Sequence, residues 1–216
     1  MTRAEFANAM HKQFIEDSDA DIGVRFETYD ALFHTGTKMI EYFSSHDRIL
    51  ISVSGGSDSD CIVHLICTYF PEYLDKCYFV FVNTGLEYAA TKRHLCDLEA
   101  KYGIKIERIR GTSVVTAVRK YGVPILNKCK AKPLSMFLRG TPKGSYFVFE
   151  RNDGVFAFTE NERLLALYCQ EKGIKVSANC CNVSKKKPIH DYIKLHNIDL
   201  DVSGERKAEG GRELQK

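Results

Sequence analysis

The chain has 216 residues, of which 44% are hydrophobic and 27% charged, and its net charge is +3. This length fits one α/β domain with a small annex, and the composition is that of a globular protein. The small net charge does not require a nucleic-acid partner, and no apolar run approaches the roughly 20 residues of a membrane helix. The polar N-terminus shows no signal peptide, so we expect a cytoplasmic protein.

Eight cysteines lie at irregular spacings along the chain. Most of them fall inside apolar helix or strand patterns, where a free cysteine packs as a small hydrophobe. In the cytoplasm they would stay reduced. Because no Cys-x-x-Cys pair exists, we expect no zinc ribbon and no other metal site built from cysteines.

The first 47 residues predict a helical extension ahead of the main domain. Apolar residues at helical spacing indicate one helix over residues 2–16 and a second over about 28–45. Neither helix carries residues that indicate chemistry. We interpret both as a cover or a partner surface.

From residue 48 onward, strand and helix patterns alternate. Strands are predicted over 48–53, 77–82 and 104–109, and helices follow them over 59–70, 88–102 and 113–121. This alternation predicts a doubly wound, mainly parallel, Rossmann-like sheet with helices on both faces. We therefore expect one α/β domain over residues 48–216.

After Pro124 the pattern changes. Residues 127–133 are basic and indicate an irregular segment. Two aromatic stretches flank Arg151-Asn152-Asp153-Gly154 and predict a small β-hairpin insertion over about 145–159. Further helices over about 160–172 and 184–196 and a last strand over 200–203 complete the predicted elements.

A glycine-rich turn joins the first predicted strand to the helix after it. Its sequence is Ser54-Gly55-Gly56-Ser57-Asp58-Ser59. Two glycines let the main chain approach an anion closely, and the amides and dipole at the start of a helix favour negative charge. The serines add hydroxyl donors. Asp58 would repel a phosphate, so it either caps the helix or holds Mg²⁺ beside the phosphates.

This turn matches SGGxDS, the motif of the PP-loop ATP pyrophosphatases, or adenine nucleotide alpha hydrolases, and it lacks the GxxxxGK[ST] and GxGxxG patterns. Three later segments resemble the phosphoadenosine phosphosulfate (PAPS) reductase family of that superfamily. They are Val82–Tyr88, with Asn83 where the family usually has Asp; Cys180-Cys181 followed by Lys186, Lys187 and Pro188; and Gly204-x-Arg206-x-x-Glu209-x-x-Arg212.

The resemblance implies that an adenine nucleotide, namely PAPS, APS or ATP, binds over the C-terminal ends of the strands. Ser54–Ser59 would hold phosphate or sulfate groups, and Asn83, Thr84 and Gly85 would lie near the adenosine. Lys186 or Lys187, together with Arg206 and Arg212, would pair with the distal anionic groups. The plainer alternatives are a solvated lysine-rich helix face and an ordinary turn at the end of a strand.

The catalytic residues stay open, with Cys180, Cys181 and Asp58 as the candidates. The resemblance implies a cysteine nucleophile near the C-terminus, but no cysteine follows Cys181. We interpret this either as a shortened member of the family or as the same fold used for other chemistry. Cys180 and Cys181 are remnants of a cluster site, reactive thiols beside basic residues, or packing residues. With a single Cys-Cys pair, we do not expect an iron–sulfur cluster.

The resemblance implies an enzyme of sulfur metabolism that acts on the phosphate or sulfate end of its nucleotide, with a thiol-donor protein as partner if it is a reductase. Two alternatives stay open. One is an ATP pyrophosphatase that adenylates another substrate, such as tRNA, for thiolation or amidation. The other is a nucleotide-binding module without catalysis. A homodimer is a further expected assembly.

Overall fold

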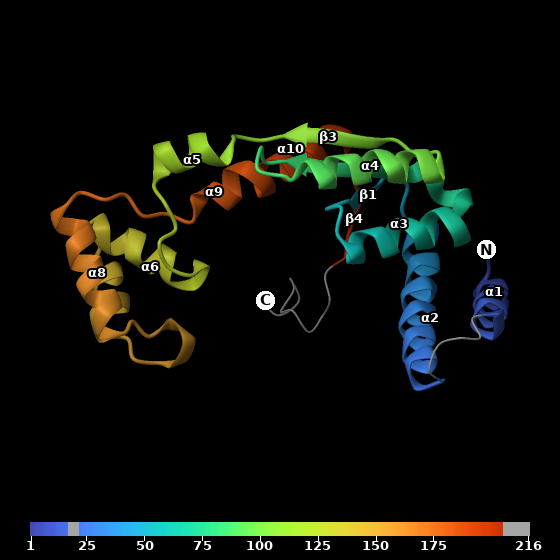
Figure 1. Cartoon of the computed structure of the whole chain (residues 1–216), viewed down its shortest axis with the longest axis horizontal. Helices are drawn as coiled ribbons and strands as arrows, with labels where there is room; N and C mark the ends of the chain where they lie inside the picture. The colour runs from blue at the N-terminus through green and yellow to red at the C-terminus, as the bar shows by residue number, and fades with distance from the viewer. Residues whose placement is uncertain (17–21, 205–216) are drawn as a thin grey trace. The chain divides into compact units, whose positions relative to one another are not determined.

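The computed structural model describes residues 1–16 and 22–204 (Figure 1). The chain divides into two compact units. Unit 1 comprises residues 1–81, 88–108 and 192–216, and unit 2 comprises residues 82–87 and 109–191. The boundary that we expected between residues 47 and 48 stays a prediction.

Unit 1 is organised around a parallel four-stranded sheet with the order β3-β2-β1-β4. The strands are β1 (Ile49–Ser52), β2 (Cys77–Asn83), β3 (Ile106–Arg110) and β4 (Leu200–Ser203). β1 is central and pairs in parallel with β2 on one side and with β4 on the other, so that Ile49 lies opposite both Cys77 and Leu200. The predicted parallel α/β sheet is therefore confirmed.

Helices cover both faces of this sheet. Phe79 and Phe81 of β2 pack in one hydrophobic cluster with residues of α3 (Ser57–Tyr69) and α4 (Ala89–Tyr102). Tyr78, which directly precedes Phe79 in β2, faces the opposite side, where its ring centroid is 5.7 Å from that of His196 in the last turn of α10 (Lys187–His196). Because successive strand residues point to opposite faces, these contacts identify a doubly wound arrangement.

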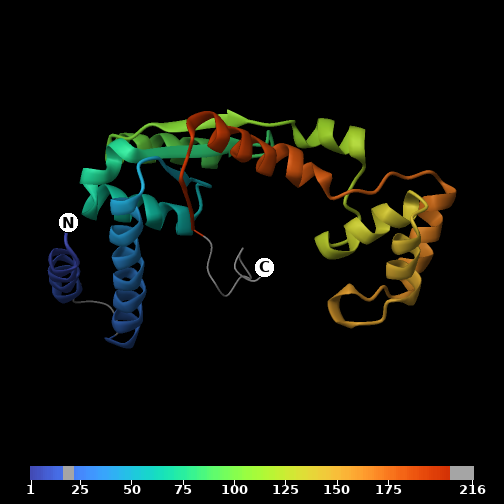
Figure 2. The ribbon, with the colours of Figure 1, turned by 180° about the vertical axis from the view of Figure 1, so that it is seen from behind.

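The N-terminal helices α1 (Arg3–Glu16) and α2 (Ile22–Ser45) lie side by side in unit 1 (Figures 1 and 2). Phe6 of α1 is fully buried, and its ring contacts those of Tyr69 and Phe70 at centroid distances of 5.6 and 5.2 Å. The helical extension is thus confirmed, and it shares its core with α3. Over the two described ranges, no helix combines the length and hydrophobicity needed to cross a bilayer.

Unit 2 is mainly helical. Its helices are α5 (Val114–Tyr121), α6 (Lys128–Leu138), α7 (Pro142–Ser145), α8 (Glu160–Glu171), α9 (Asn179–Cys181) and the first residues of α10. Between them lie the shorter turns η2 (Tyr146–Glu150), η3 (Gly154–Phe156) and η4 (Asn182–Lys186), and η1 (Pro71–Lys76) belongs to unit 1. A separate hydrophobic core, with Leu134, Phe137 and Val148 among its buried members, holds unit 2 together.

The predicted β-hairpin over 145–159 is wrong. These residues form the end of α7, the helical turn η2, the short turn η3 and the approach to α8. Gly144 lies so close to α6 that a Cβ there would be 2.2 Å from the backbone nitrogen of Phe137. Phe149 packs edge-on against the Phe137 ring at 5.3 Å. Packing on a neighbouring helix overrides the strand propensity of this aromatic run.

The basic segment 127–133, which we expected to be irregular, is the start of α6. Asn127 caps this helix, because its side chain accepts a hydrogen bond from the N–H of Lys130 at 3.0 Å. Ala131, Leu134 and Phe137 recur at helical spacing and are buried. Pro133 lies inside this helix, where it cannot donate the N–H that a helix interior normally supplies, so packing of the buried face outweighs this loss.

Candidate functional site

The glycine-rich turn of unit 1 connects β1 to α3. Ile49, Leu50 and Ile51 of β1 are fully buried, and the N–H of Val53 donates to the carbonyl oxygen of Val80 at 2.9 Å. These contacts fix the base of the turn. Helix α3 has Gly56 as its N-cap, and no side chain makes a capping hydrogen bond there. A helix that begins without a side-chain cap directs backbone N–H groups to an anion.

Gly55 gives the turn its shape. Its φ of +75° lies in the left-handed region, which a residue with a Cβ rarely adopts. A Cβ at this position would also lie 2.9 Å from Cγ2 of Thr91 in α4. The turn therefore sits directly on α4, and glycine is required for both reasons.

Two serines hold the turn together from within. The buried Ser59 donates from Oγ to the carbonyl oxygen of Gly56 at 2.8 Å and accepts from Oγ of Ser54 at 3.1 Å. Ser54 in turn accepts from the N–H of Gly56 at 3.3 Å. Ser57 is exposed, and among the described residues its hydroxyl makes one long contact, 3.4 Å from its Oγ to Oδ1 of Asp58. Ser57 is thus the serine hydroxyl best placed for a ligand.

Asp58 is exposed in the first turn of α3. The expectation that it caps the helix is wrong, because the N-cap position belongs to Gly56. Its alternative role beside Mg²⁺ stays a prediction. Among the residues that the structure describes, no group of three His, Cys, Asp or Glu side chains could hold a metal ion.

The segment after β4 meets the same turn. A Cβ at Gly204 would lie 2.8 Å from the carbonyl carbon of Asp58 and 3.0 Å from the nitrogen of Ser59. Only glycine permits this approach of the two backbones. Arg206 and Arg212, which follow in the same sequence segment, lie outside the described residues.

Within unit 2, Asn83, Thr84 and Gly85 form a turn that Glu87 organises. The Glu87 carboxylate accepts from the Thr84 N–H at 2.8 Å, the Thr84 hydroxyl at 2.5 Å and the Gly85 N–H at 3.0 Å. Burial opposes ionisation of Glu87, but these hydrogen bonds together lower its pKa. The Asn83 side chain also accepts from the Gly85 N–H at 2.9 Å. The sequence motif contained Glu87, but we did not assign it a role.

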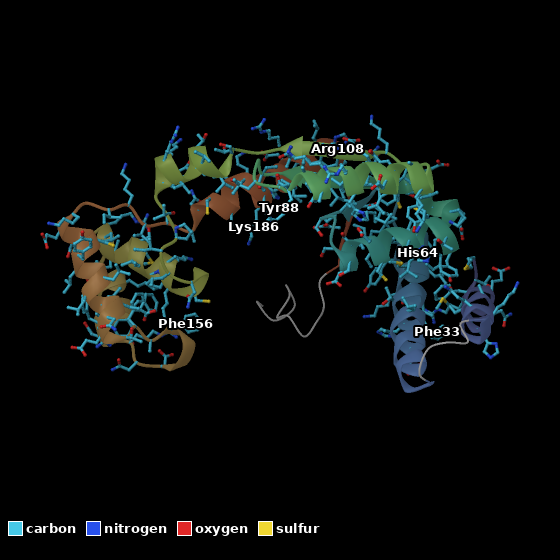
Figure 3. The ribbon with its side chains drawn as sticks, in the orientation of Figure 1. Phe33, His64, Tyr88, Arg108, Phe156 and Lys186 are labelled. Carbon is cyan, nitrogen blue, oxygen red and sulfur yellow. The ribbon has the colours of Figure 1, made fainter. Side chains whose placement is uncertain are left out.

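Arg110, at the end of β3, was also missed. It is exposed, and its Nη2 lies 4.0 Å from the position that a Cβ would take at Gly85 in the same unit. It forms no ion pair with any residue in the described ranges. By contrast, Arg108 of unit 1 pairs with Glu99 of α4 at 2.7 Å (Figure 3). Sequence alone does not distinguish these two strand arginines.

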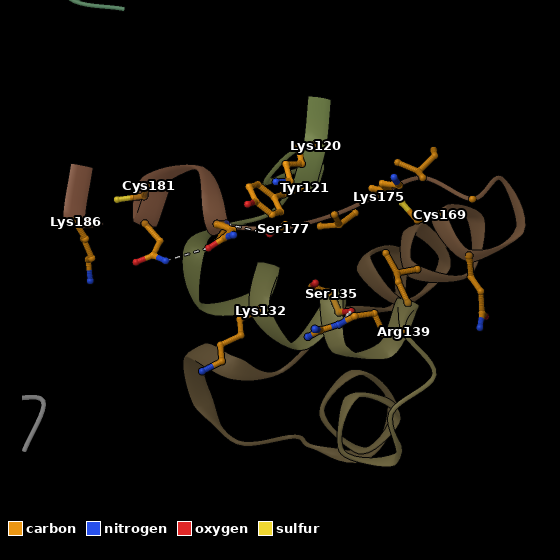
Figure 4. A pocket seen from close by; sticks show the side chains of 18 residues that line it. Lys120, Tyr121, Lys132, Ser135, Arg139, Cys169, Lys175, Ser177, Cys181 and Lys186 are labelled. Atoms are coloured by element: carbon orange, nitrogen blue, oxygen red, sulfur yellow. Dashed lines mark hydrogen bonds between the residues drawn. The ribbon is translucent and has the colours of Figure 1, made fainter. Parts of the chain in front are cut away.

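Of the two predicted lysines in unit 2, only one is available for an anion. Lys187 pairs with Asp191 one turn later, at 2.6 Å between Nζ and Oδ2. Lys186 is exposed and lines a cleft together with Cys181 (Figure 4). Cys180 and Cys181 are both partly exposed free thiols on α9. None of these residues has a demonstrated role.

Comparison with known proteins bears on the part of the chain that includes the turn. Residues 48–154 match the family described as the phosphoadenosine phosphosulfate reductase domain. The chain is also 34% identical over 96 residues to the uncharacterized protein MJ0066 of Methanocaldococcus jannaschii. This similarity covers 42% of the chain but 19% of the relative, so the chain spans about a fifth of that relative's length. Cys180, Cys181, Lys186 and Lys187 lie beyond the family match.

Proposed function

Because residues 48–154 belong to the phosphoadenosine phosphosulfate reductase domain family, we propose that the chain is a cytoplasmic enzyme that binds an adenine nucleotide and acts on its phosphate or sulfate end. The nucleotide is PAPS, APS or ATP. The observation that carries this proposal is the start of α3, which has no side-chain cap and follows Gly55 at a φ of +75°. Such a helix start binds anionic oxygens through backbone N–H groups.

In this proposal, Ser54–Ser59 hold the phosphate or sulfate groups, and the exposed Ser57 hydroxyl donates to one of their oxygens. Ser54 and Ser59 act indirectly, because their hydroxyls stabilise the turn itself. A Mg²⁺ ion would take Asp58 as one ligand and its other ligands from phosphate oxygens and water, as Mg²⁺ commonly does with nucleotides.

The remaining predicted contacts are assigned by the family resemblance and by charge. Asn83, Thr84 and Gly85 would lie near the adenosine, and Arg110 adds a cation close to Gly85. Arg206 and Arg212 would pair with distal anionic groups, whereas Lys186, which the resemblance also suggested, lines a cleft of unit 2. Lys187 contributes less, because Asp191 already neutralises it.

A second candidate function is favoured by the motif itself, because SGGxDS is shared with ATP pyrophosphatases. In that reaction, a nucleophilic atom of the second substrate bonds to the α-phosphorus of ATP. The bond from that phosphorus to the bridging oxygen breaks, and pyrophosphate leaves. Binding without turnover of any nucleotide would instead identify a non-catalytic module.

The test compares the melting temperature of the full chain with ATP, APS and PAPS, followed by assays for released sulfite, with a thiol donor, and for pyrophosphate. We expect at least one nucleotide to raise the melting temperature, and Ser57→Ala to reduce that rise. Ser44→Ala, at an exposed serine of α2, is the matched control. No stabilisation by any of the three nucleotides would contradict the proposal.

A further inference from the structure

Charge is divided unequally between the two units. Unit 2 has 15 lysines and arginines against 7 aspartates and glutamates, a net charge of +8. Unit 1 has 16 against 21, a net charge of −5, and together the units give the +3 of the chain. A local excess of positive charge attracts negatively charged partners.

Much of the positive charge of unit 2 surrounds one cleft of about 990 Å³ (Figure 4). In Figure 4, Lys132 and Ser135 of α6 and Arg139, which caps its C-terminus, lie across the hollow from the segment that carries Lys175 and Ser177. The cations that line it are Lys120, Lys132, Arg139, Lys175 and Lys186. No acidic residue belongs to the described lining of the cleft.

These five cations are not neutralised within the part of the chain that the structure describes. None of them forms an ion pair there. Arg139 donates from Nε to the carbonyl oxygen of Ser135 at 3.1 Å, and the Lys120 ammonium lies 5.3 Å from the ring centre of Tyr121. Holding like charges around one hollow costs free energy, which a bound anion would recover.

The walls of the cleft are fixed by backbone contacts and by the core of unit 2. Val123 and Val176 form a parallel bridge, with the Val123 N–H donating to the Lys175 carbonyl oxygen at 3.1 Å and the Ser177 N–H to that of Val123 at 3.2 Å. Val176 is buried in the same core as Leu134 of α6. The cations on both walls of the cleft therefore project from well-packed backbone segments.

We propose that this cleft binds a small organic molecule that carries two or more phosphate, sulfate or carboxylate groups, at a site separate from the turn at Ser54–Ser59. Its volume lies at the upper end of the roughly 300–1,000 Å³ of small-molecule sites. Single-stranded nucleic acids usually stack on several aromatic rings. Tyr121 alone supplies one among the described residues of this lining.

The first test titrates the full chain with tripolyphosphate in a calorimeter. We expect the double variant Lys132→Ala/Arg139→Ala to weaken binding at least tenfold, because both charges lie in the cleft. The matched control is Arg119→Ala/Lys185→Ala, which also removes one arginine and one lysine, but from exposed positions of unit 2 outside the cleft. It should change the affinity by less than about threefold. Equal losses in the two variants, or no binding by the wild type, would overturn the proposal.

The second test locates the ligand by the rate at which iodoacetamide modifies each cysteine. Cys181 lines the cleft, whereas the exposed Cys96 and Cys129 lie outside it. Tripolyphosphate should slow the modification of Cys181 at least threefold and leave the other two unchanged. Protection confined to Cys61, in the helix that follows the turn, would overturn a separate site. A short RNA that protects Cys181 better than tripolyphosphate would overturn the choice of a small ligand.

Discussion

The two anion sites that we propose, one in each unit of this chain, differ in how they would bind an anion. In unit 1, with its net charge of −5, the turn Ser54–Ser59 contains no cation and even carries Asp58, so within the turn the proposed anion would be bound by backbone N–H groups and the Ser57 hydroxyl. In unit 2, with a net charge of +8, five cationic side chains surround a cleft. The first arrangement depends on backbone shape and the second on charge, so different substitutions should disable them.

The largest effect on stability should come from the buried ion pair of unit 2. Nζ of Lys130 lies 2.7 and 2.9 Å from the two carboxylate oxygens of Glu162, and Lys130 is almost fully buried. Lys130→Ala leaves the partly buried Glu162 carboxylate without its partner. We expect the free energy of unfolding, measured by urea denaturation, to fall by about 2–4 kcal/mol. The control is Lys172→Ala, whose exposed pair with Glu171 should contribute less than about 0.5 kcal/mol. Similar losses in both would contradict this reading.

In unit 1 the sensitive position is Gly55. Gly55→Ala places a side chain at a φ of +75° and brings its Cβ within 2.9 Å of Thr91 Cγ2. We expect thermal unfolding to show a loss of about 1–3 kcal/mol, and nucleotide binding to weaken at least tenfold because the turn must move. Gly56→Ala is the matched control for stability, since its φ is −105° and the nearest atom to its Cβ would be 3.4 Å away. Equal destabilisation by the two would refute the role of backbone shape.

A smaller effect, with a defined pH dependence, should come from Glu87. Its pKa is lower in the folded protein than the ordinary value of 4.5 for a glutamate. The ionised carboxylate therefore contributes stability above pH 4.5, and this contribution is lost as the pH falls through the folded pKa. Glu87→Gln removes this contribution, and we expect it to cost about 1–2 kcal/mol at neutral pH. The difference between wild type and variant should shrink below about pH 4 in urea titrations. A difference that does not depend on pH would show that the charge is unimportant.

The smallest effect separates two neighbouring lysines. Lys187→Ala removes an exposed pair with Asp191 and should lower the free energy of unfolding by about 0.3–0.5 kcal/mol without affecting anion binding. Lys186→Ala should leave stability unchanged but weaken tripolyphosphate binding, because Lys186 lines the cleft. Calorimetry and urea unfolding of both variants check this. The reverse pattern would show that Lys187, and not Lys186, contacts the anion.

Sequence reasoning succeeded where the signal is local. The buried run at Ile49–Ser52, the glycines after it and the alternation of strands and helices each lie within a few neighbouring residues, so β1, the turn and α3 were predicted close to their observed bounds. The turn also carries a motif because backbone geometry restricts each of its positions. Here local pattern and tertiary structure agree.

The sequence did not predict the features that depend on packing between residues far apart in the chain. The aromatic run 146–149 has strand propensity, but it folds as a helical turn because it lies against α6. The cleft is formed by residues spread from Lys120 to Lys186, whose convergence no local pattern reveals. Likewise, Arg108 and Arg110 differ only in their neighbours, since Glu99 pairs with the first.

In the function that we propose, the start of α3 binds the phosphates of a nucleotide. Amide hydrogen exchange of the full chain, measured with and without ATP, APS or PAPS, tests it most directly. We expect slower exchange at the N–H groups of residues 55–59 with the nucleotide that raises the melting temperature, because bound oxygens would accept their hydrogen bonds. Slower exchange confined to unit 2, with these amides unchanged, would contradict it.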